Sequence, residues 1–232
     1  MIPIGDDERR LPVVPLAVWA AIAVNVWAFV QELNAPDINR FIDAYATIPY
    51  DVTHGVVLAP PSPPIPALTL VTAMFLHGGI AHIAFNMLFL AVFGPAVEYL
   101  TGHIRFVAFY LLCGIVASGA QIAVAPGSHV PELGASGAIA GVLGAYLVNF
   151  PFAQVRTIVP IGCFPLLIRL PALLVIGIWA VAQFLTGFGT LSARAAESQG
   201  GIAYFAHIGG FCTGVLVIGL MKRRRARVRL RR

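Results

Sequence analysis

The segment GASGAIAG (residues 134–141) opens the shortest apolar run of this sequence, and the expected fold follows from it. The run extends from Ser136 to Phe150 and is closed by Pro151. A helix of that length spans roughly 22 Å, whereas the hydrocarbon core of a bilayer is about 30 Å thick. Such a helix ends inside a membrane, where non-helical chain needs protein or water around it. We therefore expect a water-filled cavity around Ser136, at the N-terminal end of the helix.

The composition is that of a membrane protein. Of the 232 residues, 59% are hydrophobic and 11% are charged, and the mean hydropathy is +0.86. Soluble domains carry about 25% charged and about 45–50% apolar residues. These values exclude a disordered chain, a coiled coil, a collagen and an ordinary cytosolic enzyme. The length is compatible with one compact domain.

Six apolar runs follow one another along the sequence. We expect an all-α polytopic membrane protein, a bundle of six transmembrane helices with a short central fourth helix. The expected spans are about 11–33, 80–99, 104–125, 136–150, 170–188 and 202–221. They form one membrane domain, 11–221, between an N-terminal tail of residues 1–10 and a basic tail of residues 222–232.

The basic residues are unevenly distributed. The net charge is +5, and eight of the fifteen Lys and Arg residues lie in the last eleven positions, KRRRARVRLRR from Lys222. Such a tail can bind nucleic acid, but directly after an apolar span it is more typical of a cytoplasmic anchor that contacts anionic lipid. With six spans, thirteen basic residues fall on one side and only Arg40 and Arg194 on the other. We expect a multi-pass protein of a cell membrane of the bacterial inner-membrane type, with both termini cytoplasmic and no nucleic-acid partner.

The last apolar run contains a histidine in the segment AHIGGFCTG. Gly210 and Gly214 follow His207 by three and seven positions and share its helix face. Gly137 and Gly141 form a similar small-residue face on the short helix, and such faces let two helices approach closely. The sequence therefore predicts that His207 meets the GASG helix. Each part alone is also compatible with a structural role: a serine at a helix N-terminus, glycines for packing, and a histidine as a packing donor.

The second run holds the segment HGGIAHIAFN. Gly78-Gly79 splits this run into a short interfacial piece and a spanning helix from about Ile80. His82 and Asn86 are four residues apart and point the same way, whereas His77 is expected near the water interface. A metal site of the histidines remains an alternative, but the spacing lacks the acid of the H-E-x-x-H motif. We expect no metal and no cofactor.

Other polar residues lie inside the apolar runs without forming a recognisable chemical group. Hydrogen bonding between helices is the default role for such residues. They are Asn25, Gln31, Gln121, Asn149 and Gln183.

The three segments HGGIAHIAFN, GASGAIAG and AHIGGFCTG, in this order on six apolar helices, resemble the rhomboid intramembrane serine proteases. The resemblance extends over about 68–220. It implies that Ser136 is the nucleophile and His207 its base, and that His82 and Asn86 stabilise the oxyanion. It also implies that His77 is a polar residue near the water supply of the site.

Two features depart from the family. Some rhomboids carry an aromatic residue four positions after the serine, which stacks on the histidine; here Ala140 stands there, so His207 must be held otherwise. The first loop has FIDAYATIPYD (41–51) instead of the Trp-Arg pair of many relatives. We expect this loop, 34–64, to lack regular helix because of its proline-rich segment APPSPP.

The resulting hypothesis is a serine endopeptidase that cleaves transmembrane segments of single-span membrane proteins. No acid lies in the fourth or sixth run, so we expect a Ser-His dyad without a third member. One alternative is a proteolytically inactive relative that binds transmembrane helices. A second is a small-solute transporter, although transporters usually show paired interrupted helices and this chain has one.

Overall fold

The computed structural model describes residues 1–6, 14–58, 61–161, 164–192 and 203–223. Within these residues, five helices are long and apolar enough to cross a membrane. They are α1 (Leu16–Leu33), α5 (Ile80–Thr101), α6 (His103–Val124), α8 (Ala172–Ser192) and α9 (Tyr204–Met221). The predicted fold class, an all-α polytopic membrane protein, is confirmed.

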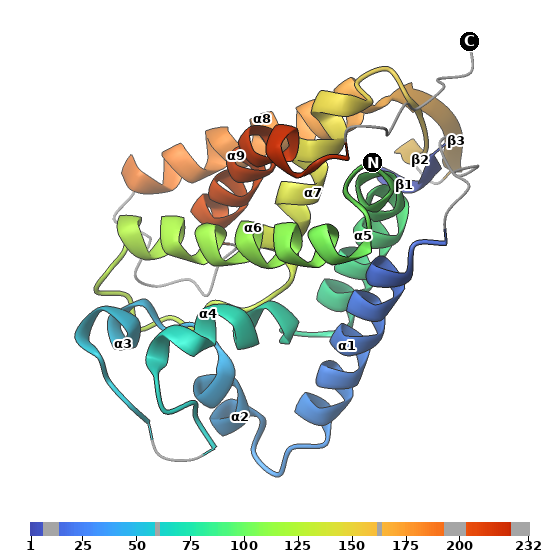
Figure 1. Ribbon diagram of the computed structural model, residues 1–232. Helices are drawn as coiled ribbons and strands as arrows, with labels where there is room; N and C mark the ends of the chain where they lie inside the picture. Colours follow the sequence, from blue (N-terminus) through green and yellow to red (C-terminus); the bar gives the residue numbers. More distant parts are fainter. Residues whose placement is uncertain (7–13, 59–60, 162–163, 193–202, 224–232) are drawn as a thin grey trace.

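Helix α7 (Ser136–Asn149) lies among the long helices and contacts α5, α6, α8 and α9 (Figure 1). All its residues from Gly137 to Tyr146 are buried. A helix that is apolar on every side is stable only when other helices surround it. At about 1.5 Å per residue it is roughly 21 Å long, which is too short to span a bilayer alone. Helix α7 therefore ends within the bundle and places Ser136 there.

The chain before α5 is broken into short helical pieces, as the sequence predicted. These pieces are η2 (Pro66–Leu68), α4 (Thr69–Thr72) and η3 (Ala73–Phe75). Gly79 then adopts a φ of 148°, a conformation that glycine reaches without strain, and α5 begins at Ile80. His82 and Asn86 consequently lie in the first two turns of α5.

The loop 34–64 contains two helices that we did not expect, α2 (Ile38–Tyr45) and α3 (Pro49–His54). The Asp37 side chain caps α2 by accepting a hydrogen bond from the backbone N–H of Arg40 at 3.1 Å. Pro49 lies in the first turn of α3, where a proline costs no intrahelical hydrogen bond. The prediction of a loop without helix was wrong because the prolines of APPSPP (59–64) restrict only the chain around them, and both helices lie before that segment.

A three-stranded antiparallel sheet, ordered β1-β2-β3, was also missed. Its strands are β1 (Ile2–Asp6), β2 (Gln154–Ile161) and β3 (Phe164–Pro171). Strands β2 and β3 form a hairpin between α7 and α8, and β1 adds to it from the N-terminal tail. The sheet lies at the end of the bundle that carries the N-terminus (Figure 1). The start of the first expected span, at residue 11, falls outside the described residues.

Candidate active site

Helices α7 and α9 touch along their backbones. A Cβ atom on Gly214 would lie 1.9 Å from the carbonyl oxygen of Gly141, and one on Gly210 would lie 2.0 Å from that of Gly137. Both distances are far below van der Waals contact, so only glycine fits at either position. The four glycines singled out in the sequence therefore form the contact between the two helices.

This contact brings Ser136 and His207 together. Ser136 is the first residue of α7 and His207 lies in the first turn of α9. Nε2 of His207 lies 2.8 Å from Oγ of Ser136, within hydrogen-bond distance. A serine hydroxyl becomes a nucleophile when a neighbouring base removes its proton. The geometry is suited to that transfer, since a general base must lie within about 2.6–3.2 Å of the proton donor.

The other ring nitrogen of His207 contacts α8. Nδ1 lies 2.7 Å from Oε1 of Gln183, and the Trp179 ring lies 5.9 Å from the imidazole, one helical turn earlier on α8. An amide oxygen only accepts hydrogen bonds, so this contact places the imidazole proton on Nδ1. Nε2 is then left with its lone pair toward Ser136, the tautomer that a general base requires.

Gln183 is a site residue that the sequence analysis assigned only to helix contacts. No motif surrounds it, and its position opposite His207 depends on how α8 docks against α9. Because Ala140 stands where some rhomboids have an aromatic residue, the sequence indicated that another side chain holds the His207 ring. It did not indicate which helix supplies that support.

His82 and Ser136 are both neighbours of Gly134, so they lie close to each other. A Cβ atom on Gly134 would lie 2.9 Å from Nε2 of His82 and 3.7 Å from Oγ of Ser136. Gly134 also has a φ of 125°, which favours glycine. The Nδ1 of His82 accepts a hydrogen bond from the backbone N–H of Gly78 at 3.3 Å. In the neutral ring the proton therefore sits on Nε2, on the side that faces Gly134 and the serine.

Asn86 lies one turn after His82 on α5 and is 7% exposed. Its Nδ2 is buried and has no hydrogen-bond partner among the described residues. Buried polar groups normally have a hydrogen-bond partner, so this unpartnered donor, one turn from His82, calls for an explanation. A role for Nδ2 in binding a group of the substrate explains why it has no partner among the described residues.

His77 is fully buried within the protein, and its depth near the water interface stays a prediction. Both ring nitrogens lack a partner among the described residues, and the ring stands edge-on to His82 at 5.2 Å. Its backbone N–H donates to Oε2 of Glu32 in α1 at 3.0 Å. The carboxylate of Glu32 thus ties α1 to the segment that precedes α5. Glu32 belongs to no motif, so the sequence alone does not mark it as a residue of the site.

The loop before α7 carries a second buried carboxyl group. The backbone of Glu132 pairs with Thr47, and its Oε2 is buried without a partner among the described residues. Burial raises the pKa of Glu132 to about 8. This loop therefore holds a largely protonated carboxyl near neutral pH, four residues before Ser136. Across the described ranges, no group of three or more His, Cys, Asp or Glu residues is arranged to hold a metal ion.

Comparison with known proteins identifies the family. The family model of the rhomboid domain matches residues 66–224. The Rhomboid protease GluP of Bacillus subtilis is 50% identical over 78 residues, which cover 34% of this chain and 15% of GluP. Rhomboid protein 1, mitochondrial, of Saccharomyces cerevisiae is 28% identical over 207 residues, which cover 86% of this chain and 51% of that protein.

A third relative, RHOMBOID-like protein 4 of Arabidopsis thaliana, is 30% identical over 152 residues, which cover 64% of this chain and 32% of that protein. The chain thus spans about half or less of the length of these three curated relatives. The family match covers more than half of this chain and includes all three segments of the site. The chain is therefore a member of the rhomboid family of multi-pass membrane proteins.

Proposed function

We propose that the chain is an intramembrane serine endopeptidase that cleaves transmembrane segments of single-span membrane proteins. Membership of the family supports a serine protease acting within the membrane. The observation that carries the assignment to particular residues is the 2.8 Å contact between Ser136 Oγ and His207 Nε2 at the partly buried N-terminus of α7.

The proposed reaction has two steps. Ser136 Oγ attacks the carbonyl carbon of the scissile peptide bond while His207 Nε2 takes the hydroxyl proton. The tetrahedral intermediate collapses, the peptide C–N bond breaks, and the imidazolium returns the proton to the leaving amine. Water then attacks the acyl-enzyme with His207 again as base, which releases the carboxylic acid and restores the serine.

In this mechanism, three donors bind the oxyanion of the tetrahedral intermediate. They are His82 Nε2, the unpartnered Nδ2 of Asn86 and the backbone N–H of Ser136. No side chain caps the N-terminus of α7, so its first amide groups and its positive dipole end are available. In a water-poor site, loss of one such donor typically lowers turnover about 10²–10³-fold.

Gln183 acts as a positioning residue in this mechanism. By accepting from Nδ1–H of His207, its amide oxygen fixes the tautomer and the ring orientation. The amide is neutral, so it stabilises the imidazolium less than a carboxylate would. Ser136 and His207 are therefore joined by a neutral third residue, Gln183 of α8. It holds the imidazole in a chain that has Ala140 at the position of the stacking aromatic residue.

We also propose that both termini are cytoplasmic and that the basic tail attracts anionic lipid. Both proposals rest on the sequence, in which thirteen of the fifteen basic residues fall on one side of a six-span topology. Reporter fusions after Met221 and within the loop 34–64 should report opposite compartments. Reports of the same compartment would contradict the orientation.

Cleavage of a generic single-span substrate by the purified protein tests the function. Wild type should cleave, and Ser136→Ala should not, although loss of a hydroxyl at a helix terminus costs only about 1 kcal/mol of stability. Ser118→Ala is the matched control, because it removes the same hydroxyl from a serine inside α6 that makes no hydrogen bond with a described site residue. Helix binding without cleavage in the wild type would favour the inactive relative instead.

A further inference from the structure

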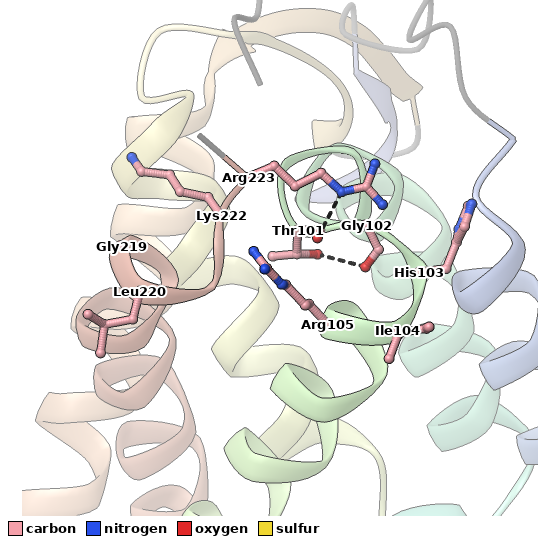
Figure 2. Close-up of a pocket in the computed structure, with 9 residues that line it drawn as sticks. All are labelled: Thr101, Gly102, His103, Ile104, Arg105, Gly219, Leu220, Lys222 and Arg223. Atoms are coloured by element: carbon pink, nitrogen blue, oxygen red, sulfur yellow. Dashed lines mark hydrogen bonds between the residues drawn. The ribbon is translucent and has the colours of Figure 1, made fainter. Parts of the chain in front are cut away.

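A second site lies at the end of the bundle where α5 and α9 end. A cavity of about 990 Å³ opens between the α5–α6 turn and the C-terminal end of α9 (Figure 2). The turn contributes residues from Thr101 to Arg105, and α9 and the chain after it contribute residues from Gly219 to Arg223. Three spanning helices end here, so the cavity lies at the depth where lipid headgroups meet the protein.

The cavity is basic. Arg105, Lys222 and Arg223 line it, and none of its described lining residues is Asp or Glu. The carboxylate of Glu98, one turn earlier on α5, contacts Nδ1 of the lining residue His103 and also faces α1. There it accepts hydrogen bonds from the backbone N–H groups of Ala17 at 2.9 Å and Val18 at 2.8 Å.

The two arginines differ in how they are held. Arg223 donates through its backbone to Leu100 and through Nε to the carbonyl of Thr101 at 3.2 Å. Its guanidinium lies directly over Gly102, where a Cβ would lie 1.7 Å from Nη2 (Figure 2). Arg105 makes no hydrogen bond or ion pair with any described residue. The site thus combines one fixed guanidinium with one that is available to a ligand.

Two further features add to the positive potential. The Lys222 ammonium lies at the rim, where it donates to the neutral amide of Asn149 at 3.3 Å. Helix α6 begins at His103 without a side-chain cap, so its positive dipole end faces the same turn. Together with the arginines, these groups favour a phosphate over a neutral ligand.

Exposed apolar side chains flank the arginines. Ile104 is 87% exposed and Leu220 is 86% exposed, and they lie on opposite sides of Arg105 (Figure 2). A soluble phosphate gains nothing from such neighbours, whereas the acyl chains of a lipid bury them. We propose that this cavity binds the headgroup phosphate of an anionic phospholipid, whose acyl chains run along Ile104 and Leu220.

The proposal is tested on the full-length Ser136→Ala protein, so that proteolysis plays no part. Phosphatidylglycerol added to the detergent-purified protein should raise its thermal midpoint and remain bound in native mass spectrometry. Phosphatidylcholine and soluble glycerol phosphate should do neither. An equal response to glycerol phosphate would show that the site takes a soluble phosphate and would overturn the lipid assignment.

Charge-matched variants separate this site, which includes Lys222 and Arg223, from the rest of the basic tail, residues 224–232. Arg105→Gln should weaken phosphatidylglycerol binding at least about fivefold, the equivalent of about 1 kcal/mol per basic residue at a membrane surface. Arg231→Gln removes the same charge from the tail and should leave the affinity nearly unchanged. Equal losses in the two variants would mean diffuse attraction to total charge and would contradict a site at the α5–α6 turn.

Ile104→Ser tests the apolar half of the site without changing charge. It should lower the affinity for phosphatidylglycerol and leave the thermal midpoint of the lipid-free protein unaltered, because the side chain is exposed. An unchanged affinity would show that no acyl chain lies along Ile104.

Discussion

Helices α7 and α8 both contact α9, but they do so in different ways. Helix α7 is buried from Gly137 to Tyr146 and meets α9 backbone to backbone at glycines. Helix α8 leaves much of its surface exposed, with Val181 58% and Leu185 71% exposed. It approaches the histidine through two side chains, Gln183 and Trp179.

The difference separates two requirements of the proposed dyad. The distance between Ser136 and His207 is set by main-chain contact, which cannot adjust without moving a helix. The orientation and tautomer of the imidazole are set by a side-chain hydrogen bond from α8. Substitutions at the α7–α9 contact should therefore lower activity by moving His207 away from Ser136. Substitutions on α8 should lower activity by changing the orientation of the His207 ring.

The largest effect is expected at the α7–α9 contact. Gly214→Val places three carbons where the Gly141 carbonyl lies, so α9 must move away. Overpacking costs about 1–3 kcal/mol, and a displacement of about 1 Å can lower the rate on the order of 10²-fold. Cleavage rate and thermal midpoint, measured on one detergent preparation, should show a steeper loss of rate than of stability.

Gly119→Val is the matched control for this variant. Gly119 also lies in a spanning helix, but a Cβ there meets nothing within 4 Å. It should retain activity. An unchanged rate in Gly214→Val would show that the glycine contact does not set the alignment.

A smaller effect is expected on the α8 side. Gln183→Leu removes the acceptor of His207 Nδ1, and one hydrogen bond contributes about 1 kcal/mol net, or about fivefold in rate. Gln183→Glu should restore the rate and change its dependence on pH, because a carboxylate stabilises the imidazolium. Failure of glutamate to rescue would indicate a merely structural role.

Gln121→Leu serves as the control for Gln183→Leu. Gln121 Oε1 also accepts a hydrogen bond from α9, from the backbone N–H of Phe205 at 3.1 Å, but it does not contact the histidine. Its loss should lower the thermal midpoint without a selective loss of rate. If both leucine variants lose rate equally, the orientation of His207 does not depend on Gln183.

The smallest effect concerns the loop that leads into α7. Burial raises the pKa of Glu132 to about 8, so the folded protein holds a proton that the unfolded chain releases. The free energy of unfolding should therefore fall as the pH rises from about 4.5 to about 8. Glu132→Gln should reduce this dependence and be more stable than wild type at pH 8, with similar stability near pH 4. If wild type and Glu132→Gln show parallel profiles of thermal midpoint against pH, the Glu132 carboxyl is solvated and its loop is not tightly packed.

Much of the fold followed from hydrophobic runs and their interruptions. The short α7, the break at Gly79 and the start of α5 at Ile80 are local consequences of apolar length and glycine. The β2–β3 hairpin was missed because its strands lie in a stretch that composition alone describes as a connection. The helices α2 and α3 were missed because the prolines nearby were given too much weight.

Some residues of the candidate site could also be predicted from local sequence patterns, and others could not. Periodicity placed Gly210 and Gly214 on one face with His207, and the small-residue face of α7 was the natural partner. Glu32 and Gln183 act across helix contacts that no local pattern specifies. Their partners, the backbone of His77 and the ring of His207, are defined only once the helices are docked.

The most direct test of the proposed dyad is labelling of Ser136 by a fluorophosphonate probe. This reagent reports activation of the serine without requiring a natural substrate. Wild type should be labelled at Ser136, and His207→Ala should be labelled much more slowly at the same pH and with the same detergent. Equal labelling rates in the two proteins would contradict His207 as the base that activates Ser136.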